Sequence, residues 1–161
     1  MPAAGATDGA RIGLVSDTHG LLRPEAIVFL RGCDHIVHAG DIGKPGILDA
    51  LAALAPLTAI RGNIDDGDWA AAVPETALVD VCGIRLHVLH DLKQLALDPA
   101  SAGVDVVVSG HSHRAGVTGR GGVLYVNPGS AGPRRFRLPV TIAELIIDSG
   151  LPVPRIHTLL P

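Results

Sequence analysis

The sequence predicts an α/β protein in which two mixed β-sheets pack face to face, with helices outside them. Three observations lead to this prediction. Short apolar segments rich in β-branched residues recur along the chain, helical patterns separate the first of them, and short turns separate the later ones. Strand–helix–strand alternation is typical of parallel sheets, whereas strands joined by short turns form antiparallel pairs.

Strands and helices alternate in the first half of the chain. Apolar, β-branched segments predict strands over residues 11–16, 35–39 and 57–61. The first predicted helix, residues 24–31, has a proline in its first turn and ends before a glycine, and the second, residues 46–54, ends before a proline. Because a helix follows each of the first two strands, we expect parallel strands with right-handed crossovers.

The second half predicts hairpins. Turn residues such as Gly121, Gly122, Ser149 and Gly150 separate paired apolar segments, so we expect antiparallel neighbours there. The strands predicted in this half are residues 76–81, 84–89, 104–109, 116–120, 123–127, 141–148 and 155–160.

Composition excludes several classes of protein. With 161 residues, 47% hydrophobic and 18% charged, the chain suits one folded domain, expected over residues 11–161 after a disordered tail of residues 1–10. No apolar run is long enough for a membrane helix. A net charge of −3, with one Trp, one Tyr and two Phe, argues against a surface that tracks nucleic acid.

The cysteines and the hydropathy predict compartment and assembly. Cys33 and Cys82 lie far apart in the chain, which favours two small buried hydrophobes in a reducing cytoplasm. The mean hydropathy of +0.37 is high for a small monomer, so a homo-oligomer is a further hypothesis.

Side chains that can bind metal follow five of the predicted strands, at the point where each strand ends. They are Asp17, His19, Asp41, Asn63, His90, His111 and His113. Because the carboxyl ends of strands line the ligand crevice of open α/β sheets, we expect these side chains to meet. Gly40, Gly62 and Gly110 directly precede three of these turns, where the backbone bends sharply beside the site.

Seven oxygen and nitrogen ligands are too many for one tetrahedral zinc ion, which takes four. Two divalent ions that share a bridging carboxylate would use all of them. Imidazole and carboxylate ligands without thiolate suit Mn²⁺, which we expect, with Fe, Zn, Ni and Co as alternatives. Water bound to such ions is a nucleophile near neutral pH, and two ions can hold the oxygens of an in-line displacement at phosphorus. The ligand set therefore predicts hydrolysis of phosphoesters.

The motifs resemble those of the calcineurin-like metallophosphoesterases, specifically their small bacterial and archaeal phosphodiesterases. The resemblance implies a four-layer α/β/β/α sandwich and spans most of the chain. The matching motifs, in the family's order, are Asp17-x-His19, Gly40-Asp41, Gly62-Asn63, His90, Gly110-His111-Ser112-His113 and Asn127-Pro128-Gly129-Ser130.

The resemblance also implies how the seven ligands divide between two ions. The first ion would be held by Asp17, His19, Asp41 and His113, and the second by Asp41, Asn63, His90 and His111. Asp41 would bridge the two ions. We therefore expect Asp41 and Asn63 to be catalytic residues as well as ligands.

Two positions depart from the family pattern. Many members carry a histidine directly after the asparagine of the third motif, where it protonates the leaving group, and this chain has Ile64 there. A general acid contributes about 10²–10⁴-fold, so its absence predicts weak activity on poor leaving groups. The small phosphodiesterases commonly lack it too. At the second position Asp91 replaces the usual glycine after His90, and it would tilt the loop or hydrogen-bond a ligand histidine.

Four further features have two interpretations each. Arg134 and Arg135 belong to the densest positive cluster of the chain, which is a solvated face or a clamp for the substrate's phosphate. His38 is a packed residue or contacts the ligand that follows it. Asp65 caps a turn or supports the site. The turn of residues 127–130 is structural or shapes the pocket.

Three functions remain open at this point. The first is a phosphodiesterase acting on a small or activated diester, which the full ligand set and the missing general acid favour. The second is a phosphomonoesterase with the same metals. The third is a non-catalytic, protein-binding scaffold of the same fold.

Overall fold

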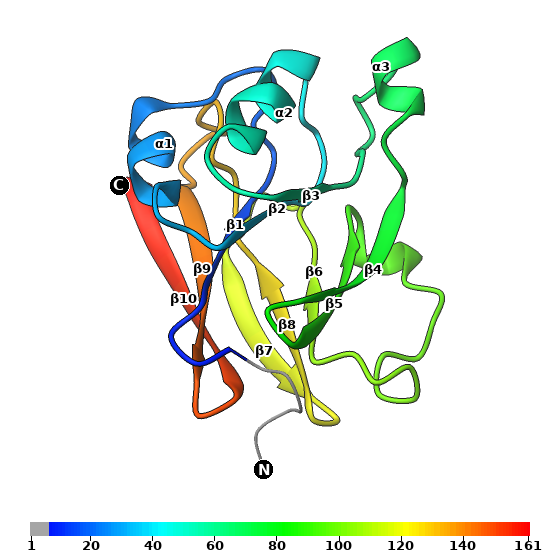
Figure 1. The fold of residues 1–161 in the computed structure, drawn as a ribbon. Helices are drawn as coiled ribbons and strands as arrows, with labels where there is room; N and C mark the ends of the chain where they lie inside the picture. Colours follow the sequence, from blue (N-terminus) through cyan, green and yellow to red (C-terminus); the bar gives the residue numbers. More distant parts are fainter. Residues whose placement is uncertain (1–6) are drawn as a thin grey trace.

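The computed structural model describes residues 7–161, which form two five-stranded sheets packed face to face (Figure 1). The first sheet consists of β1 (Arg11–Val15), β2 (His35–His38), β3 (Leu57–Ala59), β9 (Val140–Asp148) and β10 (Leu151–Leu160). Its order is β10-β9-β1-β2-β3. Strands β1, β2 and β3 run parallel, as the alternation of strands and helices predicts, whereas β9 and β10 are antiparallel.

The second sheet is also mixed. It consists of β4 (Thr76–Val81), β5 (Ile84–Leu89), β6 (Val106–Val108), β7 (Gly116–Arg120) and β8 (Val123–Asn127). Its order is β4-β5-β6-β8-β7, with β5, β6 and β8 parallel and the two edge strands antiparallel. The prediction of two mixed sheets is therefore confirmed.

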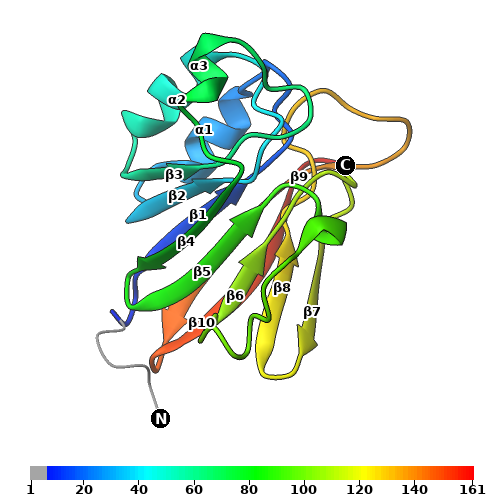
Figure 2. The same ribbon diagram turned by 90° about the vertical axis from the view of Figure 1, so that its right-hand side faces the viewer.

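Helices cover mainly the first sheet. The helical elements are α1 (Pro24–Leu30), α2 (Pro45–Ala52), α3 (Asp68–Ala71) and the 3₁₀ helix η1 (Leu92–Gln94). Figure 2 shows α1 and α2 on the outer side of the first sheet, while the segment that contains η1 runs over the second sheet. The layer outside the second sheet is thus mostly loop, which leaves part of that sheet face open to solvent.

Burial of apolar side chains holds the layers together. The main core lies between the sheets, where alternate strand residues such as Leu14 and Leu86 are fully buried. A second core between the first sheet and its helices contains Leu30 of α1 and Leu51 of α2. Each fully buried side chain of this kind contributes roughly 1.5–3 kcal/mol by leaving water.

Two-residue turns close the three hairpins. The turn residues are Cys82 with Gly83, Gly121 with Gly122, and Ser149 with Gly150, and all six have positive φ. Such turns match the right-handed twist of paired strands. The positions of the turns therefore agree with the sequence prediction.

The last strand is longer than predicted. Strand β10 begins at Leu151, although Pro152 and Pro154 lie within it. Proline cannot donate a backbone hydrogen bond, and for this reason the sequence pattern predicts a strand only from Arg155 onward. The prolines are accommodated because β10 is the edge strand of its sheet.

Part of the expected tail belongs to the fold. Residues 1–6 lie outside the described part of the chain. Residues 7–10 were also predicted to be disordered, but they hydrogen-bond to the two sheets. The Thr7 N–H donates to the Cys82 carbonyl, and the Gly9 N–H donates to the Ile147 carbonyl. Ala10 is buried against the core between the sheets.

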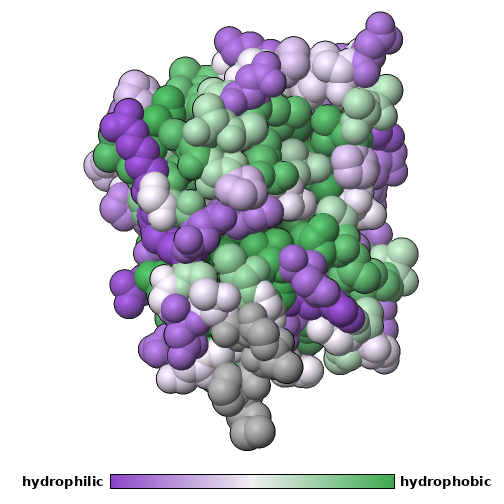
Figure 3. Space-filling model, in the orientation of Figure 1, coloured by the Kyte–Doolittle hydropathy of each residue, from purple (hydrophilic) through white to green (hydrophobic). Residues whose placement is uncertain are grey.

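The surface carries apolar side chains among polar ones. On the face shown in Figure 3, hydrophobic residues lie next to one another, with hydrophilic residues around them. Among the exposed apolar side chains of the whole described surface, that of Val28 in α1 is 63% exposed. No helix in the described part of the chain has the length and apolar character to span a membrane.

Candidate metal centre

Five of the seven predicted ligands lie together at the carboxyl ends of the central strands. They form two groups that share Asp17, with ligand atoms within 4.8 Å of one another: Asp17, His19 and His113 in one, and Asp17, Asp41 and His90 in the other. Strands of both sheets supply them, since β1 and β2 precede the two aspartates while β5 and β6 precede His90 and His113. The site therefore lies where the two sheets meet.

Left-handed backbone conformations aim these side chains. Asp17, His19, Asp41, His111 and His113 all have positive φ, between 47° and 72°. This conformation is uncommon for residues with a Cβ, although aspartate and histidine adopt it more readily than most, and it costs roughly 1–2 kcal/mol per residue. It persists because the rest of the fold holds these loops, and such strain gathers at functional sites.

Two glycines allow the ligand loops to approach each other. A Cβ on Gly62 would overlap Oδ1 of Asp41, and a Cβ on Gly110 would lie 2.7 Å from Oδ2 of Asp17 and overlap the Ser16 hydroxyl. Neither position has room for a side chain. Gly62 and Gly110, the first residues of the third and fifth motifs, are therefore required by the close contact between the loops.

Asp17 directs one carboxylate oxygen into the site. Its Oδ2 accepts hydrogen bonds from the Ser16 hydroxyl at 2.7 Å and from the His111 N–H at 3.2 Å. Its Oδ1 lies 3.7 Å from Nε2 of His19 and 3.4 Å from Nε2 of His113. Burial raises the pKa of this carboxyl and outweighs the Ser16 hydrogen bond and the nearby histidines, which lower it.

Asp41 lies between the two groups of histidines. Its Oδ2 is 3.5 Å from Nε2 of His19 and 3.3 Å from Nε2 of His90, while its Oδ1 accepts the N–H of Ile64. Burial alone would raise the pKa of Asp41, but the adjacent His90 and the Ile64 N–H lower it to about 2. A carboxylate that reaches both groups has the position a bridging ligand needs.

The backbone fixes the orientation of His90. Its Nδ1 lies 2.7 Å from the carbonyl oxygen of Ala39. A carbonyl can only accept, so Nδ1 carries the proton and the lone pair of the neutral ring is on Nε2, which faces Asp41. This is the usual arrangement of a histidine that binds metal.

The unpaired atoms of the site show that the residues fit a metal. Within residues 7–161, four buried side-chain nitrogen or oxygen atoms have no hydrogen-bond partner: Asp17 Oδ1, His19 Nε2, His90 Nε2 and His113 Nδ1. Leaving a buried polar atom unpaired costs roughly 1–3 kcal/mol. All four belong to predicted ligands, and a divalent cation is the partner that carboxylate and imidazole lone pairs share.

The other two predicted ligands lie at the edge of this cluster. The ring of His111 is edge-on to that of His90, with centroids 5.2 Å apart, and Asn63 lines a pocket together with His90. Both residues are exposed.

Asp91 accepts the N–H of Lys93 and thereby caps η1, and its Oδ2 stays 3.9 Å from Nε2 of His111.

Asp65 ties two ligand loops together. It is 7% exposed, and its carboxylate accepts three backbone N–H groups, from Ile42 at 3.0 Å, Gly43 at 2.9 Å and Gly62 at 2.9 Å. The first two follow Asp41 and the third precedes the asparagine of the third motif. Of its two interpretations, the structure supports the one in which Asp65 supports the site.

A buried chain of hydrogen bonds runs behind the site. Nδ1 of the fully buried His38 accepts the N–H of Gly40, so the neutral ring donates from Nε2 to the hydroxyl of Thr18, which in turn donates to the Ile42 carbonyl. Burial lowers the pKa of His38 to about 4. His38 is a candidate from the sequence, whereas Thr18 is not predicted there, since a hydroxyl within a ligand motif is its only signal.

The turn of residues 127–130 links the loops on the other side. Asn127 donates to the Gly110 carbonyl, and the Ser130 hydroxyl donates to the Asp17 carbonyl. This turn therefore holds two ligand loops in place, and Asn127 also lines a pocket beside them.

The two arginines differ in position. Arg134 donates to the carbonyl of Pro161, at the end of the chain. The charge of Arg135 acts on His113, whose pKa is lowered first by burial and then by His19 and by Arg135. Both arginines are exposed.

Two pockets meet at Asp91, beside the metal ligands. One, of about 500 Å³, contains His111 and extends to Tyr125. The other, of about 530 Å³, contains Asn63 and Arg61. Because segments far apart in the chain form these pockets, no local sequence pattern predicts them.

Comparisons with known proteins agree with this geometry. The sequence model of the calcineurin-like phosphoesterase superfamily domain matches residues 11–150. A probable metallophosphoesterase from Methanothermobacter thermautotrophicus is 32% identical over 162 residues, which cover 93% of this chain and 94% of that protein.

Two solved structures share the fold. An archaeal phosphodiesterase has a TM-score of 0.74 and 24% identity, with 91% of this chain and 99% of that one covered. Vps29 from Chaetomium thermophilum has a TM-score of 0.74 and 17% identity, with 92% and 96% covered. At these identities the two likenesses show the fold alone.

Proposed function

Since the chain belongs to the calcineurin-like phosphoesterase superfamily, we propose that it is a phosphodiesterase with two divalent metal ions. The observation that carries the proposal is the group of unpaired, buried ligand atoms on Asp17, His19, His90 and His113. A protein that used this face only for packing would have no reason to keep four such atoms unpaired.

We propose that the ligands divide into two sets on either side of Asp41. Asp17, which belongs to both groups of ligand atoms, would bind the first ion with His19 and His113, and His90 would bind the second with the adjoining His111 and Asn63. We assign Asp41 as the bridge, because its Oδ2 faces both sets. When bound, the ions would supply Lewis-acid activation of water and of the phosphoryl oxygens. Mn²⁺ is the ion that we propose, since the ligands are carboxylate, imidazole and amide.

Two features favour a diester over a monoester. A phosphodiester carries two ester groups, and two pockets adjoin the ligands, one on the side of His111 and the other on the side of Asn63. Ile64, in the position of the family's general acid, cannot protonate a leaving group. Substrates with good leaving groups are therefore favoured. Arg135 is the arginine whose position suits a contact with the anionic substrate.

A paired assay tests the proposal. Metal-depleted protein is resupplied with Mn²⁺ and given bis(p-nitrophenyl) phosphate or p-nitrophenyl phosphate, with a chelator as control. We expect faster hydrolysis of the diester, no hydrolysis with the chelator, and none by Asp41→Ala. Asp66→Ala, which removes an exposed carboxylate three residues after Asn63, serves as the matched variant and should stay active. Full activity of Asp41→Ala would contradict the proposed mechanism.

The likeness to Vps29 supports a second candidate, a protein-binding scaffold. In that case the fold and ligands would persist without turnover. Absence of hydrolysis of both substrates by protein that holds its metals would favour the scaffold over the enzyme.

We also propose that the protein works in a reducing cytoplasm. Cys33 and Cys82 are free thiols, and burial raises the pKa of each, so both are poorly reactive at neutral pH.

A further inference from the structure

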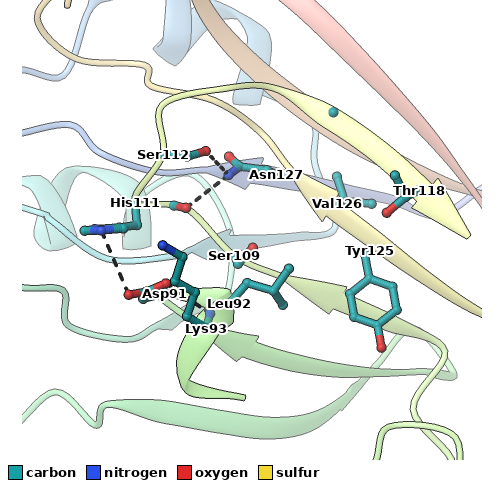
Figure 4. Close-up of a pocket in the computed structure, with 12 residues that line it drawn as sticks. Asp91, Leu92, Lys93, Ser109, His111, Ser112, Thr118, Tyr125, Val126 and Asn127 are labelled. Atoms are coloured by element: carbon teal, nitrogen blue, oxygen red, sulfur yellow. Dashed lines mark hydrogen bonds and ion pairs between the residues drawn. The ribbon is translucent and has the colours of Figure 1, made fainter. Parts of the chain in front are cut away.

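We propose that the pocket between His111 and Tyr125 binds an apolar, ring-sized ester group of the substrate. The inference rests on the proposed phosphodiesterase function and adds to it the chemical class of one ester group. Figure 4 shows His111 at one end of this pocket and Tyr125 with Thr118 at the other, with Leu92 between them.

The pocket begins at the metal ligands and leads away from them. His111 and the adjacent Ser112 form its inner end, and β7 and β8 form its floor. Its volume of about 500 Å³ lies within the range of small-molecule sites, roughly 300–1,000 Å³. A phosphorus atom beside His111 would therefore place one of its ester groups in the pocket.

The walls determine which kind of ester group fits. Most of the pocket surface is apolar, with the side chains of Leu92 and Tyr125 facing the cavity (Figure 4). Of the described residues that line it, Lys93 and Asp91 carry opposite charges, so the apolar walls determine which ester group fits. An apolar ring would cover these walls and exclude water from them.

The pocket on the other side of Asp91 differs in character. It is lined mainly by polar groups, among them Arg61, Asn63 and Glu75. The two ester groups of a diester are thus expected to differ: the group that stays on phosphorus, an apolar ring, would lie in the apolar pocket, and the leaving group in the other.

Two glycines of strand β7 provide a test with a matched control. Gly116 lines the pocket, and a Cβ built on it meets nothing within 4 Å, so this position has room for a side chain to begin, and a larger one would reduce the space in the cavity. Gly119 has the same open space but does not line the pocket, since side chains three positions apart on a strand point to opposite faces. Gly116→Leu and Gly119→Leu add the same side chain to the same exposed edge strand.

The experiment compares two diesters that share a leaving group. Bis(p-nitrophenyl) phosphate carries a second ring, whereas methyl p-nitrophenyl phosphate carries a methyl group. For Gly116→Leu we expect KM for the first diester to rise about tenfold and KM for the second to change less than about twofold. Gly119→Leu should match the wild type with both. Binding of bis(p-nitrophenyl) phosphate to each protein is measured in parallel by isothermal titration calorimetry.

Failure of this inference can be distinguished from failure of the proposed function. If both diesters are hydrolysed but Gly116→Leu behaves like Gly119→Leu, the pocket assignment is wrong and the phosphodiesterase stands. If neither diester is hydrolysed, the proposed function fails and calorimetry decides the pocket. Weaker binding by Gly116→Leu alone then supports a ring-binding site, and equal or absent binding overturns it.

Discussion

Replacement of Asp65 by asparagine tests how the fold holds the ligand loops together. The carboxylate is buried and accepts the N–H groups of Ile42, Gly43 and Gly62. Asparagine has nearly the same shape but keeps only one acceptor oxygen. Its amide group must therefore face at least one backbone N–H, donor against donor.

The loss in the free energy of unfolding of Asp65→Asn can be estimated from these contacts. Oδ2 accepts two of the three bonds and Oδ1 accepts one, so the best orientation of the amide keeps two bonds and loses that of Gly43. Hydrogen bonds to a charged group contribute about 1.5–3 kcal/mol each and neutral ones about 0.5–1.5 kcal/mol. One lost bond and two weakened ones give a decrease of about 5 kcal/mol in the free energy of unfolding. In a domain of this size that lowers Tm by roughly 10–20 °C.

Urea and thermal unfolding, with a chelator present, measure this change. Far-UV circular dichroism reports the whole fold, and the fluorescence of Trp69, the single tryptophan, reports the segment just after Asp65. The neighbouring Asp66 is exposed, so Asp66→Asn is the matched control and should stay within about 0.5 kcal/mol of the wild type. Metal affinity, measured by competition with a chromophoric chelator, should also fall about 10–100-fold in Asp65→Asn alone.

One result would refute the reasoning. If Asp65→Asn unfolds with the same midpoint and slope as Asp66→Asn, the three hydrogen bonds do not hold the loops. The close contact at Gly62 would then be maintained by packing alone.

Three further predictions follow from the site. The folded protein keeps His38 neutral down to about pH 4, so between pH 6.5 and 4 the unfolded chain binds more protons at this residue and the free energy of unfolding should fall by about 3 kcal/mol. Urea titrations in chelator should show a loss that is smaller by this amount in His38→Gln than in the wild type. Gly110→Ala should lower Tm and metal stoichiometry, because its Cβ overlaps the Ser16 hydroxyl; unchanged metal content would contradict this. Arg135→Ala should raise KM for a diester several-fold with little change in kcat, whereas an equal effect of Arg134→Ala would point to net charge instead.

Most of the architecture could be predicted from the sequence because its signals are local. Alternating apolar residues and turn residues indicate strands and hairpins without any knowledge of their neighbours. The prediction was wrong where tertiary context overrides a local preference. Prolines end a predicted strand, but β10 is an edge strand and accommodates Pro152 and Pro154. Residues 7–10 have no strand pattern, but Ala10 is buried by the second sheet.

The sequence by itself determined which residues are candidates for the site, because aspartate, asparagine and histidine are metal-binding residues and the carboxyl ends of strands line the ligand crevice of an α/β sheet. Only the tertiary structure decided how they are arranged. It brings five of them within reach of one another and leaves Asn63 and His111 at the edge. It also turns Asp65 toward three backbone donors and forms a pocket from η1, β7 and β8. These features depend on distances between segments remote in sequence, which packing of the two sheets sets and which no local pattern encodes.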